Sequence, residues 1–188
     1  MNKIFSAVVA LMLFISFSEF AVHAESPKQV PQELLAKKYP NEVIRIIKTV
    51  DLNNDNKKES FIVTDSGNFF YINSKGVLVF IEKSVGYEED EFNLSFFAVT
   101  AKEKQVALTV DYLPSNTLLY VYRLQDGTLT KKLQVMGDVG IEIDTKGRIH
   151  QYWKNFNLDS GWDQAEGIFT WNPKTNKYKP SGKYVLQK

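Results

Sequence analysis

The chain has 188 residues, with 23 Lys and Arg against 22 Asp and Glu, and no cysteine. This near-neutral balance argues against nucleic acid or an anionic membrane surface as a partner, because both attract strongly basic proteins. The lack of cysteine excludes disulfides, iron–sulfur clusters, thiolate zinc sites and cysteine nucleophiles.

Residues 1–24 have the pattern of a secretory signal peptide. A lysine precedes the apolar run at 4–17, and the small residues Val22 and Ala24 stand where a signal peptidase requires them. A membrane anchor is the alternative, but the run is shorter than the ~20 residues that cross a bilayer. We therefore expect a secreted protein that begins at Glu25 and has no membrane attachment after cleavage.

Residues 25–42 form a leader that precedes the main domain. The segment "PQELLAKK", from Pro31 to Lys38, predicts a short helix, because proline suits a first turn and good helix formers follow. From residue 43 onward the pattern alternates, and β-branched and aromatic residues lie between turn signals. We expect a single all-β domain over residues 43–188.

Twelve strands are predicted in this domain. They cover residues 43–50, 60–65, 68–73, 77–82, 92–100, 105–112, 117–123, 128–135, 140–144, 148–154, 167–171 and 177–185. They fall into groups of four with a period of ~50 residues, which is typical of propeller blades. Three blades are too few to close a ring. The options are an open array of about three four-stranded antiparallel meanders, a homodimer that completes six blades, or a single β-barrel or sandwich.

The loop "DLNNDNKKE" between the first two strands carries a pattern of oxygen ligands. Asp51, Asn53 and Asp55 stand at alternate positions of a tight turn, Lys57 offers its carbonyl, and Glu59 follows. Calcium prefers six to eight hard oxygen ligands, which such a loop supplies. An EF-hand does not fit, since strands rather than helices flank the loop. The remaining alternative is a solvated turn that binds nothing.

These residues resemble the calcium signature of FG-GAP and VCBS-type repeats, the blades of integrin-like β-propellers, in which "DxNxDGxxD" leads into an apolar strand. The resemblance implies a structural calcium ion that clamps the hairpin without doing chemistry, with Asp51, Asn53, Asp55 and Glu59 among its ligands. Two positions depart from the signature. Glu59 replaces an aspartate, and Asn56 replaces a glycine, which asparagine tolerates because it can adopt the left-handed conformation.

A second candidate site lies in the stretch "NFNLDSGWD" near the end of the chain. Its candidate ligand-binding residues are Trp162, Asn157, Asp159 and Asp163. Exposed aromatic rings with nearby polar side chains suit carbohydrate or peptide ligands. Trp162 has polar neighbours and is expected to be exposed, whereas Trp153 and Trp171 are expected in the core of the last unit.

The sequence contains no evident catalytic set. His150 is the single histidine after residue 24, no Gly-x-Ser-x-Gly motif occurs, and the acidic run at 88–91 is typical of a solvated turn. We therefore expect a secreted, non-catalytic β-repeat protein, stabilised by calcium, that binds an extracellular or cell-surface protein or carbohydrate. The alternative is a small secreted hydrolase or enzyme inhibitor that acts on extracellular polymer.

Overall fold

The computed structural model describes residues 30–112, 114–158 and 161–182. Within these residues one helix, α1 (Pro31–Lys38), precedes twelve strands. The strands are β1 (Ile44–Val50), β2 (Glu59–Thr64), β3 (Phe69–Ile72), β4 (Leu78–Glu82), β5 (Glu91–Thr100), β6 (Glu103–Tyr112), β7 (Asn116–Gln125), β8 (Thr128–Gly137), β9 (Gly140–Ile143), β10 (Ile149–Asn157), β11 (Gly161–Asn172) and β12 (Lys177–Gly182). The predicted signal peptide lies outside the described residues, among which no helix is long and apolar enough to cross a membrane.

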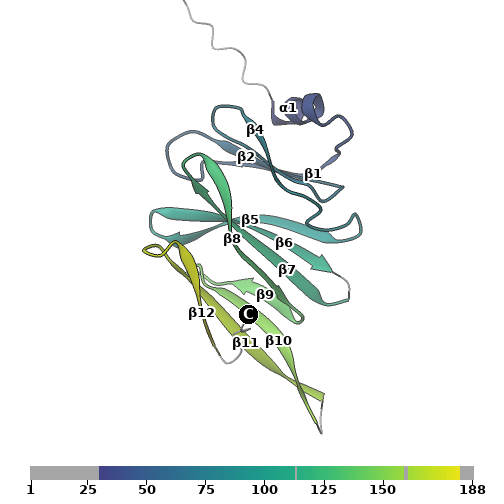
Figure 1. Ribbon diagram of the computed structural model, residues 1–188, viewed down its shortest axis with the longest axis vertical. Helices are drawn as coiled ribbons and strands as arrows, with labels where there is room; N and C mark the ends of the chain where they lie inside the picture. Colours follow the sequence, from purple (N-terminus) through teal and green to yellow (C-terminus); the bar gives the residue numbers. More distant parts are fainter. Residues whose placement is uncertain (1–29, 113, 159–160, 183–188) are drawn as a thin grey trace, which may run out of the picture.

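The strands form three antiparallel sheets of four, and each sheet is a meander in chain order. β1 to β4 make the first sheet, β5 to β8 the second, and β9 to β12 the third. The sheets are stacked one after another along the molecule (Figure 1). The predicted array of three four-stranded meanders is confirmed. In the part of the chain that the structure describes, no sheet closes into a barrel.

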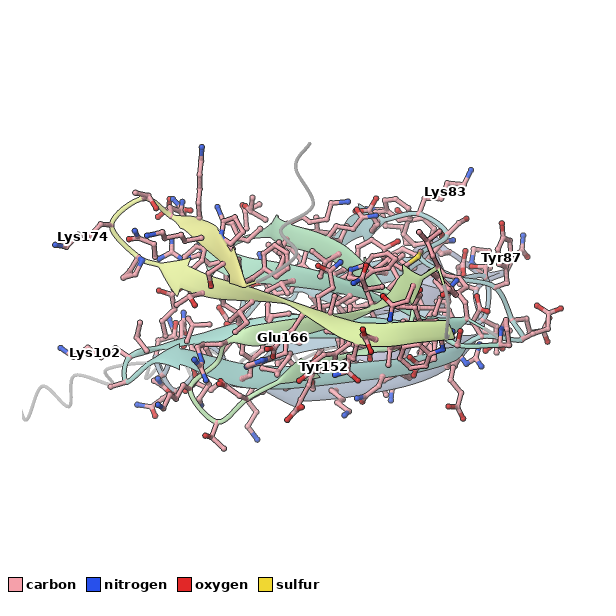
Figure 2. The ribbon with its side chains drawn as sticks, turned by 90° about the horizontal axis from the view of Figure 1, so that it is seen from below. Lys83, Tyr87, Lys102, Tyr152, Glu166 and Lys174 are labelled. Atoms are coloured by element: carbon pink, nitrogen blue, oxygen red, sulfur yellow. The ribbon has the colours of Figure 1, made fainter. Side chains whose placement is uncertain are left out.

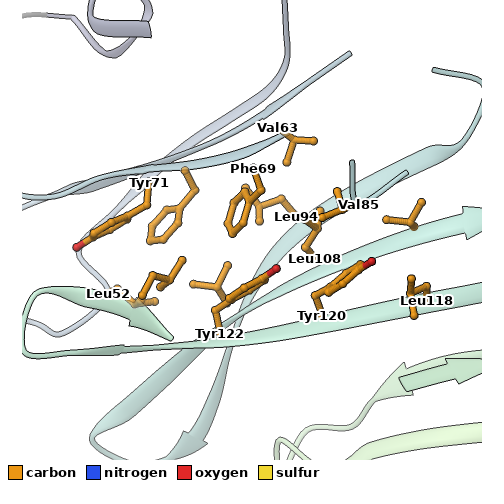
Figure 3. Packing of buried hydrophobic residues seen from close by; sticks show 14 residues of the cluster. Leu52, Val63, Phe69, Tyr71, Val85, Leu94, Leu108, Leu118, Tyr120 and Tyr122 are labelled. Atoms are coloured by element: carbon orange, nitrogen blue, oxygen red, sulfur yellow. The ribbon is translucent and has the colours of Figure 1, made fainter. Parts of the chain in front are cut away.

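The main core lies between the first and second sheets. Side chains alternate along each strand, so one face of β2 and β3 meets one face of β6 and β7. The cluster is rich in aromatic residues, and Phe69 of β3 lies 5.1 Å from Tyr122 of β7 between ring centroids. Figure 3 shows these layers, with Tyr71 and Phe69 facing Tyr122 and Tyr120. Burial of these rings holds the two sheets together.

The opposite face of the first sheet is covered by α1. The helix begins with Pro31 in its first turn and ends with Lys37 and Lys38 in its last, which suits the helix dipole. Its Leu35 is buried against Ile62 and other apolar residues of the first sheet. Since both faces of this sheet are covered, β2 is buried along its whole length.

The third sheet packs one face on the second sheet and leaves the other uncovered by any described element. Ile149 is buried against Leu119 and Val121 of β7. The hairpin of β10 and β11 is longer than predicted, because β11 begins at Gly161 rather than at residue 167. Its outer part carries polar residues and projects beyond the second sheet (Figure 1), so no core pattern marks it in the sequence.

Candidate functional site

The candidate calcium loop joins β1 to β2, and hydrogen bonds between its own side chains and its backbone hold it in a tight turn. The two carboxylate oxygens of Asp51 accept hydrogen bonds from the backbone N–H groups of Asp55 (3.1 Å) and Asn56 (2.9 Å). Asp55 in turn accepts from the N–H of Lys57 at 2.9 Å. These are Asx-type turns, in which a short acidic side chain bonds to the backbone a few residues ahead. They gather the predicted ligands into one tight turn.

Two asparagines give this turn its shape. Asn54 and Asn56 have φ angles of 59° and 63°, in the left-handed region. Asparagine is one of the few residues other than glycine that reaches this region readily. The expectation that Asn56 can replace the glycine of the repeat signature is therefore met by its backbone conformation. Asn53 contributes an amide oxygen that accepts from the Asp55 N–H at 3.1 Å.

Glu59 lies at the inner end of the loop, where it is buried. Glu59 is 2% exposed, and its Oε2 accepts a hydrogen bond from the N–H of Leu52 at 3.1 Å. No Lys, Arg or His of the described chain forms an ion pair with it. A buried carboxylate without a cationic partner is costly, because ionisation then lacks both water and a counter-charge.

The electrostatics of the loop reflect this crowding of negative charge. Burial raises the pKa of Glu59 above its usual value, and the charges of Asp55 and Asp51 raise it further, against the opposing hydrogen bond from Leu52. Burial also raises the pKa of Tyr71 on β3, together with the charges of Glu59 and Asp55. The charges of Asp51 and Asp55 thus act on the buried Glu59 beside the core.

The chemistry of the donor set fits calcium, which the resemblance implies. Three carboxylates, an amide oxygen and the Lys57 carbonyl are all hard oxygen ligands. In the described ranges no three His, Cys, Asp or Glu side chains lie together in a ready-made metal site. The oxygens of Asp51 and Asp55 instead hold backbone N–H groups. An ionised carboxylate has further lone pairs beside those that accept N–H groups, so these oxygens could bind an ion while they keep their backbone hydrogen bonds.

The described side chains of the second candidate site lie on opposite faces of the third sheet. Asn157 donates a hydrogen bond from Nδ2 to Asp163 Oδ2 at 2.7 Å across the β10 and β11 hairpin. Trp162 is adjacent to Asp163 in β11, so its side chain points to the opposite face. Trp162 is exposed, as predicted, and Lys154 lies 5.7 Å from its ring centroid. Asp159 lies outside the described residues, so the structure joins only two of the four predicted side chains.

The outer face of the third sheet holds a polar cluster that the sequence did not reveal. His150 Nδ1 lies 2.6 Å from Glu166 Oε1, and its Nε2 lies 3.3 Å from Asp144 Oδ2. Arg148 donates to the same Asp144 oxygen at 2.7 Å. The bond to Glu166 raises the pKa of His150 above its usual value, and the bond to Asp144 adds to this effect against partial burial. The two acids thus stabilise the charged form of His150, in which both ring nitrogens are donors.

The signal for this cluster was partly present in the sequence. Alternation places His150 and Tyr152 on one face, and their rings do stack there, with centroids 6.3 Å apart. Figure 2 looks onto this face and shows Tyr152 beside Glu166, its cross-strand partner. Glu166 was missed because the strand was predicted to begin one residue after it.

The predicted core tryptophans differ in burial, since Trp171 is buried and Trp153 is half-buried.

The acidic run at residues 88–91 serves the loop in which it lies. Asp90 is largely buried and accepts a hydrogen bond from the Tyr87 N–H at 2.7 Å. Arg45 of β1 donates to the backbone carbonyls of Glu88 (2.8 Å) and Asp90 (2.7 Å). These bonds attach the loop to the first sheet.

The chain matches no protein-family model, no curated protein and no solved structure. The resemblance to FG-GAP and VCBS-type repeats therefore depends on the loop residues themselves.

Proposed function

We propose that the chain is a secreted, non-catalytic β-repeat protein that a structural calcium ion stabilises and that binds an extracellular partner. The calcium ligands are the side chains of Asp51, Asn53, Asp55 and Glu59, with the carbonyl of Lys57. The ion clamps the turn between β1 and β2 and performs no chemistry.

The observation that carries this proposal is the buried carboxylate of Glu59. It lies beside two further acids with no basic residue paired to it among the described residues. Buried charged side chains in proteins are usually paired with an opposite charge or coordinate a metal ion. A calcium ion at this position neutralises the repulsion among Asp51, Asp55 and Glu59 and converts a destabilising arrangement into a stabilising one.

Terbium luminescence tests the calcium part directly. Terbium has calcium-like coordination chemistry, and a nearby tyrosine can sensitise its emission. Tyr71 is close enough to Glu59 and Asp55 to feel their charges. We expect sensitised emission that added calcium displaces, with strong loss in Asp55→Ala. The matched control is Glu88→Ala, which removes an exposed acid from another loop. Emission unchanged in Asp55→Ala would refute the assignment of the site.

The partner-binding part is supported by surfaces that the fold leaves open. One face of the third sheet has no covering element in the described chain, and it carries the exposed aromatic residues Phe156 and Trp162. Most protein surfaces expose single apolar residues, so these two alone do not identify a ligand. A more specific surface lies on the other side of the same sheet.

A further inference from the structure

A groove of about 610 Å³ runs along β8, between the edge of the second sheet and the inner face of the third. Residues 131–136 of β8 form one wall. Gln151 and Trp153 of β10 and Phe169 of β11 form the other. The groove thus combines a strand edge with an aromatic floor, which is the arrangement that domains use to capture an extended peptide.

β8 is an edge strand with unpaired backbone groups facing the groove. It is last in its sheet and pairs only with β7 among the described strands. In an antiparallel pair, alternate residues direct their N–H and C=O groups away from the partner. The carbonyl of Met136 faces away from β7, because it accepts a hydrogen bond from Gln151 Nε2 at 2.5 Å. Gln134, two residues earlier, must direct its own N–H and C=O the same way.

The side chain of Gln151 fills part of the space that a further strand paired with β8 would occupy. No backbone hydrogen bond joins β8 to the third sheet in the described part of the chain. The edge beside Gln134 therefore remains open for pairing. Two atoms in the opposite wall, Gln151 Oε1 and Trp153 Nε1, are buried without a hydrogen-bond partner among the described residues. A small rotation of either side chain would present an acceptor or a donor to a peptide in the groove.

The charge of the groove selects its occupant. Lys131 and Lys132 lie in its wall. Lys131 pairs with Glu82 at 2.8 Å, whereas Lys132 forms no ion pair within the described residues. Lysines on an exposed edge oppose pairing with an identical edge. A second copy of this chain would bring the same lysines, while an acidic peptide would neutralise Lys132, which Glu82 does not reach.

We propose that this groove binds an extended acidic peptide, which adds to the edge of β8 as a further strand. Alternate side chains of such a peptide point to opposite sides. Apolar ones pack on Leu133, Val135 and Phe169. Acidic ones lie on the side of Lys131 and Lys132, where a register shift in β8 at Lys132 interrupts the alternation. The inference deepens the proposed function, because it supplies the partner and the surface of the binding role. It does not require the calcium loop.

The test is calorimetric titration of the full chain with a synthetic probe, acetyl-Glu-Val-Glu-Leu-Glu-Val-Glu-amide. We expect saturable binding. Gln134→Pro removes the outward N–H but no bond to β7, so the sheet tolerates it. This variant should bind about tenfold more weakly, a loss of one well-made interaction. The matched control, Gln134→Ala, loses the same side chain, with its hydrogen bond from Lys131, but retains the N–H, so it should bind about tenfold more tightly than Gln134→Pro.

A modified probe makes the result independent of protein stability. Two versions of the same peptide carry N-methyl groups on one or the other set of alternate backbone amides and keep all side chains. The version methylated on the amides that face β8 cannot pair with its edge and should not bind, whereas the other version should still bind. A probe with lysine in place of glutamate should bind about tenfold more weakly or not at all. Binding equal to that of the parent peptide by both N-methylated versions, or by the lysine probe, would overturn the proposal.

Two further outcomes are distinguishable. Concentration-dependent dimers that Gln134→Pro abolishes would assign the groove to a second copy and overturn the peptide. Titrations run in calcium and in chelator separate this proposal from the calcium proposal. No probe binding in a protein whose melting temperature rises with calcium overturns the groove alone. Probe binding without a calcium response overturns the calcium site alone.

Discussion

Replacing Leu52 with alanine should destabilise the protein far more than its place in a polar loop suggests. Leu52 follows the first acid of the candidate calcium loop, yet it is 2% exposed and belongs to the main core cluster. Figure 3 places it at the edge of this cluster, near Tyr71. Its backbone N–H also donates to Glu59. The side chain thus anchors the loop to the core between the first two sheets.

The expected cost follows from this burial. Truncation of a fully buried leucine to alanine removes its apolar contacts and leaves a cavity, at a cost of about 2–5 kcal/mol. For a protein of this size, each kcal/mol lowers the melting temperature by roughly 2–4 °C. The total stability of a domain is only about 5–15 kcal/mol. The variant should therefore remain folded in the cold and melt markedly earlier.

Urea unfolding, followed by tryptophan fluorescence and by circular dichroism, measures this cost. The matched control is Leu158→Ala, because Leu158 is fully exposed at the tip of the third sheet's hairpin. We expect the control to change stability by about 0.5 kcal/mol or less. A Leu52→Ala loss no greater than that of Leu158→Ala would refute the anchoring of the loop to the core.

Three further predictions follow from the structure. In chelator at pH 7, Glu59→Gln should be more stable than the parent, because the raised pKa of Glu59 means that ionisation of this side chain opposes folding. The stability advantage of the variant should shrink as pH falls through that pKa. Urea unfolding curves that give an equal advantage at pH 4 and pH 7 would contradict this prediction. The stability that His150 contributes should be complete at low pH and should decline as pH rises through its raised pKa. An NMR titration of the ring protons of His150 should show this raised pKa. Glu166→Gln should lower the pKa of His150. Protein recovered from a secreting host should begin at Glu25 by mass spectrometry, whereas Ala24→Asp should retain the precursor; equal processing of both would refute the predicted cleavage site.

The sequence predicted the fold well because the dominant physical signals were local. Alternation of apolar residues marked all twelve strands, and Pro31 marked the start of the helix whose bounds match the prediction. The extension of β11 to Gly161 was missed, since the outer hairpin packs on no other sheet and needs no apolar alternation. The stacking order of the sheets follows from contacts distant in the sequence, which no periodicity encodes.

The candidate sites were less predictable than the fold. The spacing of acids identified the turn after β1, and the left-handed Asn56 agrees with its glycine-like role. Burial of Glu59 could not be predicted from the spacing of the loop, because it arises from the folded arrangement in which Leu52 of the same loop joins the core. The cluster around His150 depends on the register of β10 against β11, and a shift of one residue would move Glu166 to the other face.

The thermal midpoint of residues 25–188 in excess chelator and in millimolar calcium tests the central claim most directly, with magnesium as the control ion. With calcium at about a hundred times its dissociation constant, the native state gains ~2.7 kcal/mol by mass action. At roughly 2–4 °C per kcal/mol, the midpoint should rise by roughly 5–11 °C. We predict that this rise is selective for calcium and is lost in Asp55→Ala. An unchanged midpoint, or the same rise in Asp55→Ala, would contradict a calcium clamp between β1 and β2.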